Sequence, residues 1–412
     1  MKYEDYVDLN YKPNPKKEII ASFYFEPNDK NLKKVAGAIA AESSTGTWSE
    51  VKENSYVKKI SAKVFELKKN FVKIAYPLEL FELGNLPNLL SSIAGNIFGM
   101  KIVKNLKLLD VQFPRKYVKS FRGPKFGIKG IRKMLKIKKR PLIGTIVKPK
   151  VGLNTKDFAK VAYEAWKGGI DIVKDDENLA SQNFNKFEKR IELVLKAKEK
   201  AEKETGEVKG YLANVTSETF EMIKRAYLLE EFGNNYMMVD ILTIGFSALQ
   251  TLRNQEFNLA LHAHRAMHAA ITRNPKHGIS MYFIAKISRL VGVDQIHTGT
   301  AGIGKMKALE NETELCNEFL RSEWFRVRKV LPVASGGLHP GLIPALVKKL
   351  GNDIVIQAGG GIHAHPKGTF AGAKAMREVV EGLIEGYTTK EIAKKSEEVR
   401  LAIKKWGYRR VK

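Results

Sequence analysis

Apolar residues follow two alternating patterns from residue 142 onward. Short runs rich in β-branched residues predict strands, and longer segments with apolar residues three and four positions apart predict helices. Eight strands are predicted, at 142–148, 170–176, 210–215, 236–242, 259–264, 295–298, 331–334 and 354–358. Helices are predicted between and after them, at 155–167, 184–203, 218–232, 280–290, 312–324, 342–350 and 369–384. Strands that alternate with helices indicate a parallel sheet, and eight such units are the number that closes a (β/α)₈ barrel.

A doubly wound open sheet is the alternative architecture for this order of elements. Such a sheet usually has a glycine-rich turn after its first strand, whereas Lys148, Pro149 and Lys150 stand there in this chain. We therefore predict an α/β protein with a TIM barrel over residues 141–387 and a helical extension over 388–412.

The first 140 residues show a different order of elements. Strands are predicted at 18–25, 60–67, 71–76 and 106–112, with helices at 32–41 and 86–93. This mixed order predicts a separate α+β domain over residues 1–140, whose last part connects it to the barrel.

Composition indicates a folded protein of a reducing compartment. Hydrophobic residues make up 44% of the 412 residues, which is enough apolar surface to offset the entropy of the chain. The single cysteine, Cys316, excludes an intrachain disulfide and a cysteine-cluster metal site. No run of about 18 apolar residues and no signal-peptide pattern occurs, so we expect a cytoplasmic protein with no membrane partner.

Charge is the most unusual feature of the composition, with a formal net charge of +27. Residues 115–140 contain twelve basic residues and no acidic one. Such a segment is typical either of a nucleic-acid patch or of the solvated surface of a lysine-rich protein. Its only aromatic residues are Tyr117, Phe121 and Phe126, which do not form a base-stacking pattern. We favour the solvated surface and expect no specific nucleic-acid partner.

Six of the predicted strands end in polar or glycine-rich residues. Because the active sites of these barrels lie at the carboxyl ends of the strands, these residues are the candidates for chemistry. They are Lys148 and Lys150; Lys174, Asp176 and Glu177; His262, His264 and Arg265; His297; Ser335, Gly336 and Gly337; and Gly359, Gly360 and Gly361.

The second strand ends in a lysine and two carboxylates. Lys174 and Asp176 are two positions apart, so they point to one face, and Glu177 joins them where the strand ends. Two carboxylates favour a hard cation such as Mg²⁺, while a lysine beside carboxylates is also typical of a simple ion pair. A lysine converted by CO₂ to a carbamate would add an anionic oxygen, which requires an amine with a lowered pKa.

Glycines after the last two strands stand where these barrels bind phosphate, although glycine is also the usual residue of turns. Cations and donors from Arg265, His297, Ser335 and Lys305 would suit a small doubly phosphorylated anion. The 299–305 segment, GTAGIGK, is either a mobile lid that brings Lys305 to the substrate or an ordinary loop. A zinc pair formed by His264 and His268 is a weaker alternative, because no companion cysteine accompanies it.

These motifs, together with AAESSTGTW at 40–48 and GNIFGMK at 95–101, closely resemble the large subunit of ribulose-1,5-bisphosphate carboxylase/oxygenase, RuBisCO. The length of the chain is most similar to that of the archaeal form III enzymes. The resemblance covers nearly the whole chain. It implies a ferredoxin-like α+β N-terminal domain, a catalytic TIM barrel, and an active site shared across a homodimer or an assembly of dimers, with no small subunit.

The resemblance also implies the roles of individual residues. Lys174 matches the lysine that is carbamylated by activator CO₂ and binds Mg²⁺ with Asp176 and Glu177. Lys148 matches the acid/base lysine and Lys305 the lid lysine. The remaining matches are His264 in the site; Lys150, Arg265, His297, Ser335, Gly336, Gly337, Gly359 and Gly360 for substrate; and Glu42, Thr47, Trp48 and Asn96 from the partner subunit.

The implied reaction joins CO₂ and water to ribulose 1,5-bisphosphate and releases two molecules of 3-phosphoglycerate, with O₂ as the competing substrate. In the family, the carbamate removes the C3 proton, an enediolate attacks CO₂, and Lys148 donates the last proton. A RuBisCO-like enolase or isomerase of sulphur salvage is the nearest rival, but such proteins commonly lose lid and second-phosphate residues that this chain has. A polyanion-binding protein that uses residues 115–140 is the rival of another class. The sequence leaves open whether the substrate comes from nucleotide salvage or from a carbon-fixation cycle.

Overall fold

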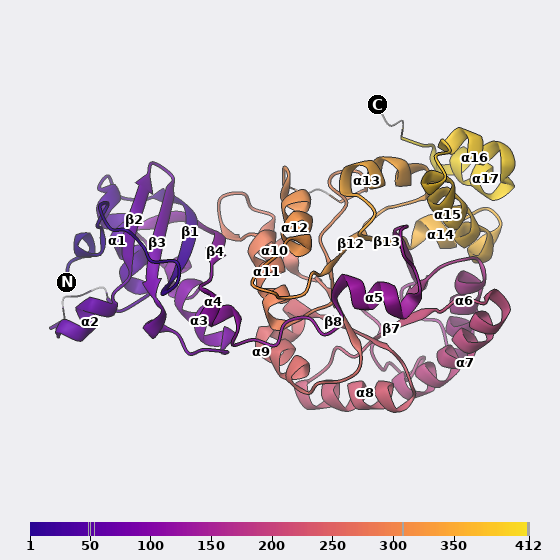
Figure 1. Ribbon diagram of the computed structural model, residues 1–412, viewed down its shortest axis with the longest axis horizontal. Helices are drawn as coiled ribbons and strands as arrows, with labels where there is room; N and C mark the ends of the chain where they lie inside the picture. The colour runs from indigo at the N-terminus through magenta and orange to yellow at the C-terminus, as the bar shows by residue number, and fades with distance from the viewer. Residues whose placement is uncertain (48, 50, 53, 307–308, 410–412) are drawn as a thin grey trace. The chain divides into compact units, whose positions relative to one another are not determined.

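The computed structural model describes residues 1–47, 49, 51–52, 54–306 and 309–409. These residues form two compact units, each of which is visible in Figure 1. One unit contains Met1–Arg122 and Met267–Val291, and the other contains Gly123–Ala266 and the described residues from Gly292 on. The chain therefore passes between the two units three times.

The first unit is built on a five-stranded mixed sheet in the order β10-β4-β1-β3-β2. The strands β1, β2, β3 and β4 pair antiparallel, and β10 pairs parallel to β4. The strands are β1 (Glu18–Pro27), β2 (Lys63–Lys68), β3 (Phe71–Pro77), β4 (Val103–Gln112) and β10 (Gly278–Ile279). The helices are α1 (Leu32–Glu42), α2 (Ser55–Ile60), α3 (Leu86–Ile93), α4 (Arg115–Val118), α10 (His268–Thr272) and α11 (Met281–Val291), with 3₁₀ turns η1 (Tyr3–Tyr6), η2 (Leu78–Leu80) and η3 (Asn96–Gly99).

Asparagine caps fix the starts of several helices in this unit. The side chain of Asn31 accepts a hydrogen bond from the Lys34 N–H at α1, and Asn85 caps α3 in the same way. Asn54 caps α2, so residues 55–60 are helical and the strand predicted at 60–67 begins only at Lys63. The local competition between a capped helix and a strand explains this difference.

The 267–291 segment belongs to the first unit although it falls within the predicted barrel range. The strand β10 pairs with β4, and the buried Lys107 ammonium on β4 donates to the carbonyls of Thr272 at 2.9 Å and Asn274 at 2.5 Å. Lys286 on α11 also binds Asp110. Backbone carbonyls satisfy the buried charge of Lys107, which anchors this segment to the sheet.

The second unit is a closed barrel of eight parallel strands, as predicted. Its strands are β5 (Leu142–Ile146), β6 (Ile172–Lys174), β7 (Gly210–Asn214), β8 (Tyr236–Asp240), β9 (Ala260–His264), β11 (Gln295–His297), β12 (Leu331–Ser335) and β13 (Val355–Gln357). Its helices are α5 (Gly127–Leu135), α6 (Thr155–Lys167), α7 (Phe187–Thr205), α8 (Thr219–Glu231), α9 (Ile241–Asn254), α12 (Glu312–Arg321), α13 (Ile343–Leu350), α14 (Gly360–His363), α15 (Gly368–Ile384), α16 (Thr389–Lys395) and α17 (Glu397–Trp406), with the turn η4 (Pro340–Leu342).

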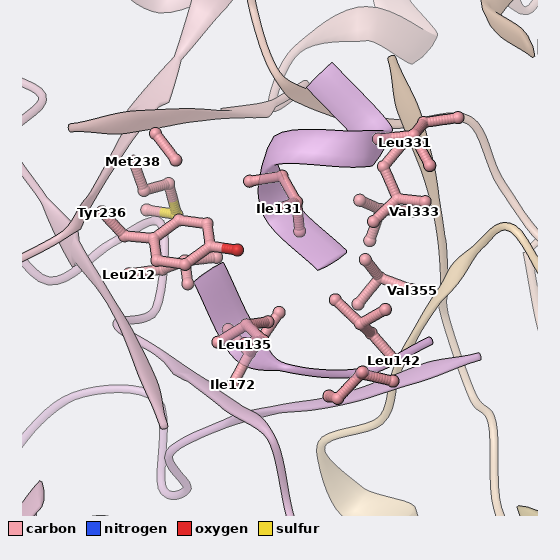
Figure 2. Close-up of a cluster of buried hydrophobic side chains, with 13 residues drawn as sticks. Ile131, Leu135, Leu142, Ile172, Leu212, Tyr236, Met238, Leu331, Val333 and Val355 are labelled. Atoms are coloured by element: carbon pink, nitrogen blue, oxygen red, sulfur yellow. The ribbon is translucent and has the colours of Figure 1, made fainter. Parts of the chain in front are cut away.

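Apolar side chains fill the barrel near the amino ends of its strands, and α5 packs against them there. Ile131 and Leu135 of α5 pack among inward-facing residues of the strands, as Figure 2 shows. The strand residues in this cluster are Leu142, Ile172, Leu212, Tyr236, Met238, Ala260, Leu331, Val333 and Val355. The basic 115–140 segment, which the sequence suggested is a connector, therefore includes a helix whose apolar face is part of the barrel core.

The helix α9 is absent from the sequence-based prediction. The strand predicted at 236–242 ends at Asp240, because α9 begins at the next residue. Gly245 has φ +76°, so the backbone is not helical at that position inside α9. This interruption, together with the direct transition from strand to helix, hides the helical pattern between 243 and 254.

Candidate active site

Inward-facing residues at two-residue spacing on single strands lead from the apolar core of the barrel to a polar site. Ile172 on β6 lies in the apolar cluster, and Lys174 and then Asp176 follow at two-residue spacing on the same face. On β8 the same spacing leads from Met238 to Asp240. Because all eight strands are parallel, these side chains meet at one end of the barrel.

Lys174 is the buried centre of this site. The side chain is 1% exposed, and its Nζ donates to the Asp175 carbonyl at 2.7 Å and lies 3.5 Å from Glu177 Oε2 and 3.1 Å from Met238 Sδ. Burial lowers the pKa of the Lys174 ammonium, against the opposing effect of the surrounding carboxylates. The site therefore favours the free amine more than water does.

Two lysines in the loop after β5 lie against the Asp176 carboxylate. Lys148 Nζ donates to Asp176 Oδ2 at 2.8 Å, and Lys150 Nζ lies 3.7 Å from Asp176 Oδ1 while it donates to Asn178 at 2.7 Å. Asp176 is fully buried. The structure thus brings Lys148, Lys150, Lys174, Asp176 and Glu177 together, as predicted.

His264 faces the carboxylates from the end of β9. Its Nδ1 donates to Asp240, and its Nε2 lies 3.6 Å from Glu177 Oε2. This geometry orients the ring toward Glu177. His268, the other member of the weaker zinc-pair alternative, bonds the Thr272 hydroxyl through its Nδ1 at 3.0 Å.

Arg265, His297 and Ser335 come from the next strands of the same rim. His297 Nδ1 and the Ser335 hydroxyl are 2.7 Å apart. Arg265 Nη2 would lie 3.1 Å from a Cβ placed on Gly299, so its guanidinium extends to the loop that follows β11. Burial lowers the pKa of His297 well below its usual range, so this ring is neutral near pH 7.

The glycines of the rim make room for two lysines. Gly336 and Gly337 have φ of +116° and +74°, and a Cβ on Gly337 would lie 2.7 Å from Lys305 Cγ. The Lys305 backbone N–H donates to the Gly336 carbonyl at 3.0 Å, which seats the 299–305 loop on this turn. On the other side, a Cβ on Gly359 would lie 2.9 Å from Lys148 Cε.

Matches to known proteins agree with this geometry. The family model described as ribulose bisphosphate carboxylase large chain, catalytic domain, matches residues 127–406, and that of the N-terminal domain matches residues 5–117. The chain belongs to this family. The ribulose bisphosphate carboxylase of Pyrococcus abyssi is 52% identical over 98% of this chain and 97% of its own length. That of Methanocaldococcus jannaschii is 50% identical over 98% of this chain and 100% of its own length.

Solved structures of family members have the same fold. The octameric enzyme of Pyrococcus horikoshii OT3, described in complex with sulfate ion, superposes with a TM-score of 0.95 at 49% identity, covering 100% of this chain and 98% of that one. The dimeric archaeal enzyme of Hyperthermus butylicus gives 0.93 at 46% identity, covering 99% and 100% of the two chains.

Of the family residues expected in the N-terminal unit, two lie close together. Asn96 Nδ2 is 3.4 Å from Glu42 Oε1, an exposed hydrogen bond between η3 and the end of α1. Thr47 is exposed, and Trp48 lies outside the described residues. The catalytic-domain match begins at 127, within the basic segment, at the first residue of α5.

Sequence reasoning missed several polar residues that support the site. Asp240 orients His264, and Gln295 bonds His262 at 2.8 Å. Asp240 is the last residue of β8, so the rule of polar strand ends could have found it. His363 also escaped notice: its Nε2 is 2.9 Å from the Thr145 hydroxyl, which itself donates to the Ala358 carbonyl.

No helix within the described residues is long and apolar enough to cross a membrane.

Proposed function

We propose that the chain is a ribulose-1,5-bisphosphate carboxylase. It would join ribulose 1,5-bisphosphate, CO₂ and water into two molecules of 3-phosphoglycerate, with O₂ taken in a side reaction. The observation that carries this proposal is the buried Lys174 amine beside Asp176 and Glu177, on a rim that also holds Lys148 and Lys305.

The donor set fits a hard cation once Lys174 is modified. Among the residues that the structure describes, no group of three or more His, Cys, Asp or Glu side chains is placed to hold a metal ion. Asp176 and Glu177 supply two carboxylates, and a carbamate on Lys174 would supply the third anionic oxygen ligand that Mg²⁺ prefers. When bound, Mg²⁺ would polarise the substrate oxygens at C2 and C3.

The environment of Lys174 supports carbamate formation. Only the free amine reacts with CO₂, and the reaction converts R–NH₂ and CO₂ to R–NH–COO⁻ with release of one proton. Burial lowers the pKa of Lys174, which raises the fraction of free amine at neutral pH. The carbamate then carries the negative charge beside a bound cation.

Two side chains of this site would move protons during the reaction. The Lys174 carbamate would accept the proton from C3 of the substrate, which makes C2 nucleophilic toward CO₂. After addition of water and cleavage of the C2–C3 bond, the Lys148 ammonium would donate a proton to C2 of the product molecule that contains this carbon. Asp176 holds Lys148 Nζ at 2.8 Å, which keeps the donor on this rim.

The remaining rim residues would bind the substrate. Arg265 would bind one of its two phosphates, with His297 and Ser335 beside it, and the backbone N–H groups around Gly336, Gly337, Gly359 and Gly360 would line the phosphate sites. Lys150 would add a cation near the metal ligands. His264 lies within the site, facing Glu177.

We also propose that the active unit is a homodimer or an assembly of homodimers without a small subunit. The structural relatives are described as dimeric and octameric, which supports this. Glu42, Thr47, Trp48 and Asn96 of one protomer would then complete the site of the other. The Glu42–Asn96 pair, whose Oε1 and Nδ2 atoms are 3.4 Å apart, would face the substrate.

Incorporation of labelled CO₂ tests this function. Purified protein preincubated with CO₂ and Mg²⁺ and then given ribulose bisphosphate should yield labelled 3-phosphoglycerate, two molecules of product per CO₂ consumed. An enolase or isomerase would exchange or rearrange a substrate without fixing CO₂. Absence of labelled product, with rearranged substrate instead, would overturn the proposal in favour of that rival.

A further inference from the structure

A chain of four buried or half-buried side chains leads from the barrel core to the rim. Gln295 Oε1 is 2.8 Å from His262 Nδ1, His262 Nε2 is 2.9 Å from His297 Nε2, and His297 Nδ1 is 2.7 Å from the Ser335 hydroxyl. At the end that lies in the barrel core, Gln295 Nε2 donates to the Tyr236 hydroxyl at 3.3 Å. Tyr236, His262 and Gln295 are completely buried.

Each hydrogen bond in this chain fixes the next one. A neutral imidazole has a single N–H, so it donates with one nitrogen and accepts with the other. Burial lowers the pKa of His262 to about 3 and that of His297 well below its usual range, so both rings are neutral at pH 7. Because Gln295 Oε1 accepts from His262 Nδ1, His262 Nε2 must accept from His297, and His297 Nδ1 must accept from Ser335.

Charges at the two ends favour this direction over the reverse. In this order every N–H or O–H bond points from the rim toward Gln295, so the positive end of the summed dipole lies at the Gln295 end. The buried carboxylate of Asp294 acts on Tyr236, which Gln295 contacts, and the cationic Arg265 acts on His297 at the rim. A carboxylate near the positive end and a guanidinium near the negative end both stabilise the order.

We propose that Gln295 and His262 are positioning residues that commit the Ser335 proton to His297, so that Ser335 presents only oxygen lone pairs to the substrate. This rests on the proposed function, because it assigns a role at that site. With both ring nitrogens engaged, His297 acts on the substrate through Ser335. Ser335 therefore accepts a hydrogen bond from a substrate hydroxyl, and a sugar bisphosphate that lacks that hydroxyl binds more weakly.

Nitrogen NMR of the resting protein tests the proton order without any turnover. The protein contains eight histidines, so solid-state spectra of [¹⁵N]histidine-labelled protein are tractable, and His262→Phe identifies the His262 signals by their loss. We expect His262 protonated on Nδ1 alone and His297 on Nε2 alone. A His262 ring protonated on Nε2, or a doubly protonated His297, would overturn the proposal whether or not the protein is a carboxylase.

A pair of glutamine variants tests the consequence for the substrate. Gln295→Met keeps the side-chain length but removes the amide, so the His297 tautomer is no longer fixed. Gln357→Met is the matched control, since Gln357 is also a buried barrel glutamine, 1% exposed, but lies outside this chain of hydrogen bonds. We expect Gln295→Met to raise KM for ribulose bisphosphate about 3- to 10-fold, the worth of one hydrogen bond, with kcat little changed.

Two further readouts separate positioning from simple loss of packing. Gln295→Met should show His297 signals for both tautomers, whereas Gln357→Met should show the wild-type spectrum. Equal KM values for the two variants, or an unchanged His297 tautomer in Gln295→Met, would refute the positioning role. Should Gln295→Met fail to fold, the wild-type spectrum alone still decides the proton order.

Discussion

At the scale of single residues, most of the site follows from where each side chain stands on its strand. The two-residue spacing of Lys174 and Asp176, directly after an apolar strand, predicted that they share a face, and in the structure both belong to one cluster of charges with Glu177, Lys148 and Lys150. The partner of His264 was not predictable in the same way. Its bond to Asp240 joins adjacent strands whose pairing only the closed barrel fixes.

The lid lysine gives a prediction that separates carboxylation from enolisation. Removal of the C3 proton does not need Lys305, whereas charge that develops on the new carboxylate does. Loss of such an electrostatic contact typically lowers the rate by about 10²- to 10³-fold. We therefore expect Lys305→Ala to keep exchange of the C3 proton with solvent, measured in deuterated water, while formation of 3-phosphoglycerate falls by that factor. If both rates fell together, Lys305 would act in binding or closure instead.

His363 predicts how stability depends on pH. Burial, with a smaller contribution from Lys148, lowers its pKa to about 4 from an ordinary value of 6.5. The unfolded chain therefore binds a proton more readily, so the stability due to neutral His363 is complete above pH 6.5 and is lost as the pH falls toward 4. At pH 5 the loss from this group is about 2 kcal/mol.

Denaturant unfolding at pH 7 and pH 5 measures this effect. His363→Gln keeps a polar side chain next to Thr145 but cannot titrate in this range. Its free energy of unfolding should fall less between the two pH values than that of the wild-type protein. An identical fall in both proteins would show that His363 is already protonated in the folded state.

At the scale of elements, the apolar pattern predicted all eight barrel strands and most helices, but not α5 as part of the core. The charge of the 115–140 segment dominates its composition. Yet Ile128, Ile131 and Leu135 recur on one face of α5 at three- and four-residue spacing, and that face is buried in the barrel. Pattern alone could indicate an amphipathic helix here, but only the closed barrel shows what it packs against.

A truncation in α5 measures its contribution to the core. Ile131 is completely buried, so Ile131→Ala should lower the free energy of unfolding by about 2 to 5 kcal/mol. Lys129→Ala, on the exposed face of the same helix, should change it by less than about 0.5 kcal/mol. Denaturant titration of both variants checks this. A small effect of Ile131→Ala would mean that the end of the barrel against which α5 packs is stable without this contact.

At the scale of the whole molecule, the sequence predicted a domain boundary at 140, whereas the compact units divide between Arg122 and Gly123. In addition, the 267–291 segment belongs to the first unit. A linear pattern of strands and helices cannot show that a short strand from the middle of the barrel sequence pairs with β4. The buried Lys107, which donates to two backbone carbonyls, was a single lysine without a motif. Its role depends on a contact between residues far apart in the chain.

Complementation between inactive chains tests whether the site is shared between protomers. Lys174→Met removes the barrel's site, and Glu42→Gln alters the residue proposed to reach the partner's site. Each variant alone should be nearly inactive. When the two are co-expressed, half of the randomly formed dimers carry one intact site out of two, so about a quarter of wild-type activity should return. No recovery in verified mixed dimers would place Glu42 in its own protomer's site or outside any site.

The most direct test of the account is carbamate formation on Lys174. Purified protein equilibrated with ¹³C-labelled bicarbonate and Mg²⁺ should show a carbamate resonance that is absent from Lys174→Met, whose unbranched side chain should fit beside the Met238 thioether that Lys174 Nζ contacts. Activity of the wild-type protein should rise with the same CO₂ dependence as this signal, and protein kept free of CO₂ should start slowly. A signal that persists in Lys174→Met, or full initial activity without CO₂ and Mg²⁺, would contradict the account.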